Sequence, residues 1–285
     1  MSASLSPVEL LAHESRVRYG PVAAEVGGAT VAPGRLEFGD CGFVLNCPSG
    51  LRFRYDKGAG VTVDRPPGAD AAEEVLWLQG SCYAAIASLH GFFPLHASAV
   101  ACEGRVYAFS GPAGAGKSSL VAELGRHGLA LFCDDTLLLD LSGAEVRCLP
   151  GHKRLKLLPD ALAMTGASRE EKVMDDWDKF YATPPGGTVE QALPLGRLCF
   201  LETGGEVAFA PIAKGGERLA RLEDDHYTAD LFARAAGHPL AERFRLLGRL
   251  ARDVAMSRFI RPFDPNRFAR DAALAARQIR DWAAA

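Results

Sequence analysis

Residues 111–118 read G-P-A-G-A-G-K-S, and this stretch decides the fold of the chain. It matches the pattern G-x-x-x-x-G-K-[ST] of a phosphate-binding loop, whose backbone N–H groups surround phosphates while the lysine reaches the outer ones. The run V-Y-A-F-S before the loop predicts a strand, and residues 117–127 after it predict a helix. This strand–loop–helix context favours a bound nucleoside triphosphate with Mg²⁺ over the alternative, a glycine-rich turn without a ligand.

The loop and the first turn of the helix are expected to supply the nucleotide contacts. Lys117 should reach the phosphates, and the hydroxyl of Ser118 should bind the metal ion. The residues expected to contact the nucleotide are Gly111, Pro112, Ala113, Gly114, Ala115, Gly116, Lys117, Ser118 and Ser119.

Two adjacent aspartates, Asp134 and Asp135, end the stretch L-A-L-F-C-D-D soon after the loop. A helix of about eleven residues rises roughly 16 Å, and a strand of about five residues returns about the same distance. The pair should therefore lie level with the phosphates. One carboxylate is expected to hold Mg²⁺ beside Ser118, and the other to take a proton from an attacking hydroxyl. The alternative is a pair that only caps the end of the strand.

His96 precedes the loop on a predicted hairpin. If the turn is centred on Glu103 and Gly104, antiparallel pairing places His96 opposite Ser110 or Gly111, at the mouth of the phosphate site. A histidine there is suited to hydrogen-bond an aspartate or a phosphate oxygen. The alternative is a buried histidine whose ring is satisfied by backbone groups.

The bulk composition excludes several classes of protein. The chain has 285 residues, of which 48% are hydrophobic, and a formal net charge of −3. There is no basic excess, so nucleic acid is not an expected partner. The seven cysteines are scattered without a C-x-x-C pair, which argues against zinc and fits a reducing cytoplasm. Residues 75–102 lack charges, but glycine, proline, glutamine and histidine interrupt them, so we expect no membrane segment. The first residues also lack a signal-peptide pattern.

The distribution of apolar residues predicts an α/β fold in two parts. Short alternating runs over residues 15–64 predict antiparallel strands, and residues 71–89 predict a helix. Residues 1–91 are therefore expected to form a β-rich N-terminal subdomain ending in a helix, and residues 92–285 the P-loop catalytic domain. Within the latter we expect a hairpin around Ser142 and Gly143, a mobile polar loop over residues 166–190, and mostly helices from Arg218 onward.

The motifs H-A-S-A-V, G-P-A-G-A-G-K-S-S and D-D resemble the kinase domain of HPr kinase/phosphorylase, a bacterial enzyme that phosphorylates a serine of a phosphocarrier protein. The resemblance covers residues 92–140, and it extends more distantly to phosphoenolpyruvate carboxykinase. It implies a P-loop kinase fold of that type, with ATP and Mg²⁺ as ligands. It also implies that Lys117, His96, Asp134 and Asp135 are catalytic, and that Ser118 and the two aspartates serve the metal.

The departures from that family refine the expectation. A glycine-containing signature that HPr kinases use for the reverse reaction has no clear counterpart, so we expect a kinase that works only forward. The layout resembles the smaller HPr-kinase-related proteins, some of which accompany gene clusters for lasso peptides. This implies a cytoplasmic serine kinase acting on a peptide or small protein, such as a ribosomal precursor peptide, and possible homo-oligomers. The alternatives are a small-molecule kinase and a regulatory nucleotide-binding module without phosphoryl transfer.

Five further basic residues are weaker candidates. Lys153, Arg154 and Lys156 follow the aspartates and are suited either to grip a phosphate or to form a solvated strand face. Lys179 lies in the polar segment, which is suited either to close over a nucleotide or to form a solvated run of charges. Arg261 ends an apolar run, and either reaches the site or has a structural role.

Overall fold

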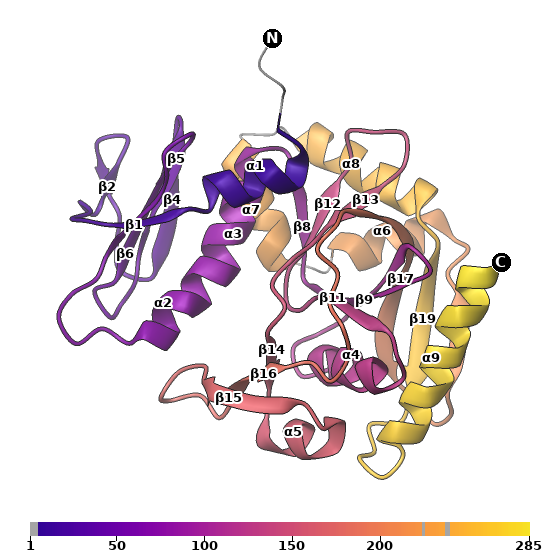
Figure 1. Cartoon of the computed structure of the whole chain (residues 1–285). Helices are drawn as coiled ribbons and strands as arrows, with labels where there is room; N and C mark the ends of the chain where they lie inside the picture. Colours follow the sequence, from indigo (N-terminus) through magenta and orange to yellow (C-terminus); the bar gives the residue numbers. More distant parts are fainter. Residues whose placement is uncertain (1–4, 224–225, 237–239) are drawn as a thin grey trace.

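The computed structural model describes residues 5–223, 226–236 and 240–285. These residues form a mixed α/β fold whose strands belong to a five-stranded, a nine-stranded, a three-stranded and a two-stranded sheet (Figure 1). The predicted α/β class is confirmed. In the described part of the chain, no helix combines the length and the apolar character needed to cross a membrane.

The N-terminal part is a short helix followed by the five-stranded sheet, in the order β1-β7-β6-β5-β4. Its strands pair antiparallel as predicted, except that β1 runs parallel to β7. Burial alternates along β6, because one face of the sheet packs on the core and the other meets solvent. The elements are α1 (Pro7–Glu14), β1 (Val17–Tyr19), β2 (Glu25–Val26), β3 (Ala29–Thr30), β4 (Arg35–Gly39), β5 (Gly42–Asn46), β6 (Arg52–Asp56) and β7 (Gly60–Asp64).

The predicted helix over residues 71–89 is present, with one turn of different geometry in its middle. It consists of α2 (Ala71–Trp77), the π-helical turn η1 (Leu78–Cys82) and α3 (Tyr83–Leu89). The carboxylate of Asp70 caps it by accepting from the backbone N–H of Ala72 at 2.8 Å. Residues of α3 share one hydrophobic cluster with the five-stranded sheet and with Leu138 of the larger sheet. The division of the chain at residue 91 stays a prediction.

The nine-stranded sheet carries the site. Its order is β11-β9-β10-β17-β13-β12-β8, with β19 added on β17 and β18 on β19. The predicted hairpin around residues 142–143 is confirmed, since β12 and β13 pair antiparallel across it. The strands are β8 (Phe93–Leu95), β9 (Ala97–Cys102), β10 (Arg105–Ser110), β11 (Ala130–Cys133), β12 (Leu137–Asp140), β13 (Arg147–Leu149), β17 (Leu193–Thr203), β18 (Ala208–Pro211) and β19 (Met256–Arg261).

Strand directions bring several chain ends to one edge of this sheet. β10, β17 and β19 run parallel, whereas β9 is antiparallel to both β10 and β11. β11 therefore runs in the same direction as β10. The carboxyl ends of β10, β11 and β19 and the amino end of β9 consequently meet at the same edge, where open sheets of this kind bind their ligands.

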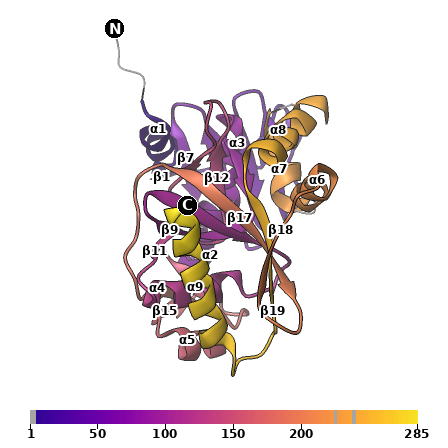
Figure 2. The same cartoon turned by 90° about the vertical axis from the view of Figure 1, so that its right-hand side faces the viewer.

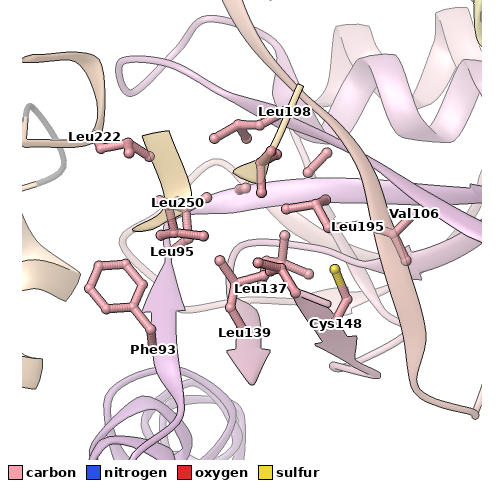
Figure 3. Close-up of a cluster of buried hydrophobic side chains, with 14 of the residues drawn as sticks. Phe93, Leu95, Val106, Leu137, Leu139, Cys148, Leu195, Leu198, Leu222 and Leu250 are labelled. Atoms are coloured by element: carbon pink, nitrogen blue, oxygen red, sulfur yellow. The ribbon is translucent and has the colours of Figure 1, made fainter. Parts of the chain in front are cut away.

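Helices cover both faces of the sheet, because alternate strand residues face opposite sides. Ala97 and Ala99 of β9 belong to a hydrophobic cluster with Leu222, Phe232 and Leu250, which come from three helices. Figure 3 shows Leu222 and Leu250 of this cluster beside residues of the sheet. On the other face α4 and α9 pack, and Figure 2 shows α9 lying in front of the strands. The helices are α4 (Lys117–Arg126), α5 (Pro159–Thr165), α6 (Gly215–Glu223), α7 (His226–Ala236), α8 (Leu240–Asp253) and α9 (Phe268–Ala284).

The expectation of a loop over residues 166–190 is wrong in part, because this segment contains two strands. β15 (Ser168–Lys172) and β16 (Phe180–Thr183) pair antiparallel, and β14 (Leu155–Leu157) completes a three-stranded sheet on β16. The strands were not expected because their sequence is polar. Contacts across the sheet stabilise them: Arg154 forms an ion pair with Glu170, and its guanidinium stacks on Tyr181.

Candidate functional site

Three glycines shape the backbone of the loop between β10 and α4. Gly111, Gly114 and Gly116 have φ angles of +152°, +81° and +81°, which residues with a side chain rarely adopt. A β-carbon at Gly116 would also lie 2.8 Å from Nη2 of Arg261. Gly116 is the N-cap of α4, so the unpaired N–H groups and the positive end of that helix face the loop. This is a ready-made site for an anion.

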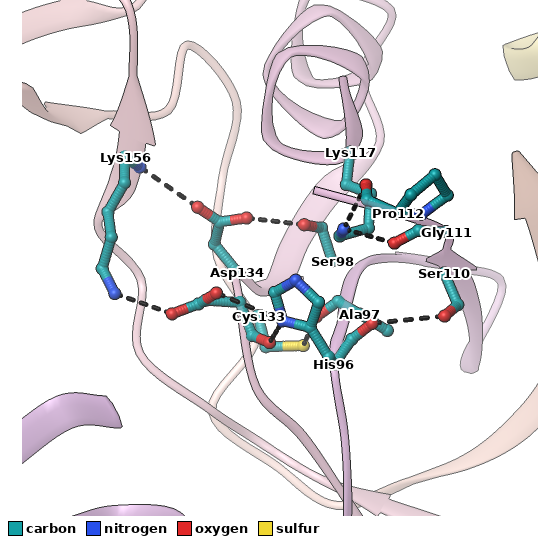
Figure 4. A network of polar contacts seen from close by, with 11 residues as sticks. His96, Ala97, Ser98, Ser110, Gly111, Pro112, Lys117, Cys133, Asp134 and Lys156 are labelled. Atoms are coloured by element: carbon teal, nitrogen blue, oxygen red, sulfur yellow. Dashed lines mark hydrogen bonds and ion pairs between the residues drawn. The ribbon is translucent and has the colours of Figure 1, made fainter. Parts of the chain in front are cut away.

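The Lys117 side chain folds back into the loop. Its ammonium donates to the backbone oxygens of Gly111 at 2.7 Å and of Pro112 at 3.2 Å (Figure 4). The residue is only 7% exposed. The structure therefore places this positive charge inside the glycine-rich turn, where the motif predicts it.

Asp134 follows β11 and is almost fully buried beside the start of α4. Its carboxylate accepts from the Ser98 hydroxyl at 2.6 Å and from the backbone N–H of Lys156 at 3.1 Å (Figure 4). The hydroxyl of Ser118 also hydrogen-bonds it. Burial, with a smaller contribution from the charge of Asp135, raises the pKa of Asp134 above its usual value.

Asp135 has a different environment, although it is the next residue. Its carboxylate forms an ion pair of 2.7 Å with Nζ of Lys156 and lies 3.3 Å from Nδ1 of His96. Burial alone would raise the pKa of Asp135, but Lys156, His96 and Lys179 together hold it below its usual value. Its φ of +71° is unusual for a residue with a side chain. Backbone strain of this kind is found most often at functional sites.

His96 lies at the amino end of β9, as the predicted hairpin requires. Ala97 pairs with Ser110, and the hydroxyl of Ser110 donates to the backbone oxygen of His96 at 3.3 Å. The predicted placement at the mouth of the loop is confirmed. The imidazole Nδ1 donates to the backbone oxygen of Asp135 at 2.9 Å, and the side chain keeps 35% of its surface exposed. The ring is therefore not fully buried, but a backbone oxygen does satisfy it as the alternative interpretation expects, and the catalytic role of His96 stays a prediction.

Of the weaker candidates, Lys156 and Arg261 contact the site residues directly. Lys156 contacts both aspartates, one through its backbone and one through its side chain. Arg261, at the end of β19, donates to the backbone oxygen of Ala115 at 2.9 Å and so supports the loop. Lys179 is near enough for its charge to lower the pKa of Asp135.

Lys153 and Arg154 contact other parts of the fold. The Lys153 ammonium donates to the backbone oxygen of Phe132 and lies over its ring, and Arg154 pairs with Glu170 and Glu171. Ser98 is a further site residue that was not predicted from the sequence. The signal was available, because the motif H-A-S-A-V places Ser98 two residues after His96 on the same face of a strand.

The residues present fit a magnesium ion. The Asp134 carboxylate and the Ser118 hydroxyl are adjacent hard oxygen donors at the phosphate loop, and Mg²⁺ takes one or two such protein ligands beside phosphates and water. Asp135 instead turns its carboxylate to Lys156. Within the described ranges, no three histidines, cysteines, aspartates or glutamates cluster as a metal site.

The chain has a distant structural likeness to one known class of protein and no match in sequence. No family model and no curated protein matches the chain. Among solved structures, the chain is similar to the HPr(Ser) kinase/phosphatase from Coxiella burnetii. The two share 14% identity over 66% of this chain and 88% of that one, with a TM-score of 0.35. A likeness this distant carries no argument about function.

Proposed function

We propose that this protein is an ATP-dependent kinase that transfers the γ-phosphoryl group to a serine hydroxyl. The observation that carries the proposal is the pair of unlike carboxylates beside the phosphate loop. Asp134 is buried and hydrogen-bonded to Ser118, whereas Asp135 is partly exposed and contacts two basic groups. A nucleotide-binding module needs only one carboxylate for its metal, so the second one favours chemistry.

In this proposal the loop, the N-terminus of α4 and Lys117 bind the phosphates of ATP. Ser118 and Asp134 would hold Mg²⁺, which neutralises charge on the β- and γ-phosphates. The Lys117 ammonium exchanges the loop carbonyls for phosphate oxygens and stabilises the charge that develops during transfer. Ser98 and the backbone N–H of Lys156 fix the Asp134 carboxylate in the position from which it would bind Mg²⁺.

Asp135 is the proposed general base. The acceptor oxygen forms a bond to the γ-phosphorus while the bond from that phosphorus to the β,γ-bridging oxygen breaks. ADP leaves with the electrons of the broken bond, and the hydroxyl proton passes to Asp135. Asp135 is ionised at neutral pH, as a group that is to take a proton must be, because its pKa lies below the already low value of an ordinary aspartate. His96 orients it through contacts to its backbone oxygen and its carboxylate.

The acceptor is proposed to be a serine of a peptide or small protein, with lasso-type precursor peptides as the first candidates. The motif resemblance supports this choice. The segment between β15 and β16 adds a surface feature, since the half-exposed ring of Trp177 lies among Asp175, Asp176 and Asp178. Such a surface suits a basic, extended chain. The end of this segment lies near Asp135, because the charge of Lys179 acts on that carboxylate.

The test is transfer of label from γ-labelled ATP to candidate peptides, each compared with its Ser→Ala form. We expect label on the serine peptides only, and no release of pyrophosphate when a phosphoserine peptide is given inorganic phosphate. Label on metabolites but on no peptide would favour a small-molecule kinase. ATP binding without transfer to any acceptor would contradict the proposal and leave the regulatory module.

A further inference from the structure

A cavity of about 280 Å³ lies apart from the phosphate loop. Its walls come from α1, β1, β7, η1 and α3 of the N-terminal part. The end of β13, the segment after it and Glu190 complete them. Most of its lining is apolar, and representative residues are Leu11, Val61, Leu78, Ile86 and Leu149. Figure 1 shows α1 beside α3, two of the elements that contribute. None of the loop residues or the two aspartates lines it.

Two polar atoms on lining residues lack a hydrogen-bond partner among the described residues. They are the hydroxyl of Ser15 and Nε2 of His152, and both atoms are buried. A buried polar atom without a partner costs free energy, so such atoms usually mark a place for a bound molecule or water. Two of them on lining residues mark the polar side of the cavity wall.

The wall also contains the π-helical turn η1. Leu78 and Gln79, which both belong to this turn, line the cavity. A π turn inserts an extra residue into a helix, and such turns occur frequently at functional sites. The turn thus forms part of the cavity wall.

The charge of the lining restricts the class of ligand. Among the described lining residues Glu190 is the only one with a formal charge. Burial, helped by the nearby Lys156 and Lys153, lowers the pKa of His152 to about 4, so its ring is neutral at pH 7. A cavity with one carboxylate and no cation disfavours anions.

The segment from residue 150 to residue 156 connects the cavity to the aspartate pair. Pro150 and His152 line the cavity, and Tyr83, another lining residue, donates to the backbone oxygen of Pro150 at 3.1 Å. At its other end, Lys156 contacts both Asp134 and Asp135. A molecule that displaces His152 or Pro150 therefore acts on the residue that holds both carboxylates.

We propose that this cavity binds a small neutral or cationic molecule with a compact apolar body and one hydrogen-bonding group, and that occupancy is coupled to the nucleotide site through residues 150–156. The binding part stands independently of the kinase assignment, whereas the coupling part rests on it.

The test uses three probes that share one aromatic ring: benzylamine, benzyl alcohol and benzoate. Binding to the full chain is measured by calorimetry without nucleotide. We expect benzylamine and benzyl alcohol to bind and benzoate to bind at least tenfold more weakly. No binding of either expected probe means that the cavity holds only water, which overturns the proposal, and equal binding of benzoate overturns the ligand class.

Variants locate the bound probe. Val8→Phe fills the cavity from α1 and should abolish binding, whereas Leu10→Phe, on the same helix but outside the lining, should not. Ser15→Val should weaken benzyl alcohol by roughly two- to twelvefold, and Ser15→Thr, which keeps the hydroxyl, should restore it. Circular dichroism confirms that each variant folds, and unchanged binding in both Val8→Phe and Ser15→Val would place the probe elsewhere.

Coupling is read from the affinity for ATP with Mg²⁺ at saturating benzylamine. Benzylamine should change the affinity for ATP by some factor. Saturating ATP should then change the affinity for benzylamine by the same factor. An unchanged ATP affinity overturns the coupling. If ATP did not bind at all, the kinase assignment would fail. The binding of benzylamine would still test whether the cavity is a ligand site.

Discussion

At the scale of single residues, Lys117 is held by the same loop that is proposed to hold the phosphates. Lys117→Ala should abolish measurable ATP binding, because it removes the charge that reaches the β- and γ-phosphates. Its effect on folding should be small, since the two backbone oxygens it contacts lie in a loop. Calorimetric titration with ATP and Mg²⁺ measures the first effect, and thermal unfolding the second. Undiminished affinity in a folded variant would show that the loop is not the nucleotide site.

A second residue-scale prediction concerns the dependence of activity on pH. Lys156 lowers the pKa of Asp135, so the base stays ionised to a lower pH than an isolated aspartate would. Lys156→Met removes the ammonium but keeps the backbone N–H that contacts Asp134. The pKa of Asp135 should then rise, and the acidic limb of the kcat/KM profile should move to higher pH. An acidic limb at the same pH would show that Asp135 is not the group that titrates in it.

At the scale of elements, the junction of β10, α4 and β19 fixes the shape of the loop. Gly114→Ala and Gly116→Ala place a side chain at the same φ of +81°, which costs roughly 1–2 kcal/mol. Only at Gly116 does the new β-carbon also meet Arg261, whose hydrogen bond to Ala115 should break at a cost of roughly a further 1–3 kcal/mol. Urea unfolding of the two variants measures the difference, and equal losses would contradict this role of Arg261.

The elements predicted correctly from the sequence are those whose contacts join residues close together in the chain. The strand, loop and helix around Gly111 follow from adjacent residues, and the tight turn at Glu103 and Gly104, with φ of +46° and +72°, set the register that placed His96. The length match of helix and strand placed the aspartates. These predictions needed no contact between distant segments except the hairpin itself.

Strands with a polar sequence were missed. β15 and β16 pair with each other and β14 pairs with β16, while Arg154, directly before β14, forms an ion pair with Glu170 of β15. The position of Lys156 depends on the same sheet, because its backbone reaches Asp134 only when β14 lies beside the end of β11. A sequence pattern does not indicate that these two segments lie beside each other.

At the scale of the whole molecule, one edge of the nine-stranded sheet gathers parts from distant regions of the chain. The loop follows β10, the aspartates follow β11, His96 precedes β9, and Arg261 ends β19. In the proposed function this assembly is a kinase whose two carboxylates have separate roles: Asp134 serves the metal and Asp135 takes the proton.

The most direct measurement compares Asp134→Asn with Asp135→Asn for both ATP affinity and phosphoryl transfer. Asp135→Asn should bind ATP with Mg²⁺ normally and lose roughly 10²–10⁴-fold in turnover, the usual contribution of a general base. Asp134→Asn should lose turnover and also the Mg²⁺ dependence of ATP affinity. Near-normal turnover in both folded variants would contradict the account and would leave the two aspartates as a cap on the end of β11.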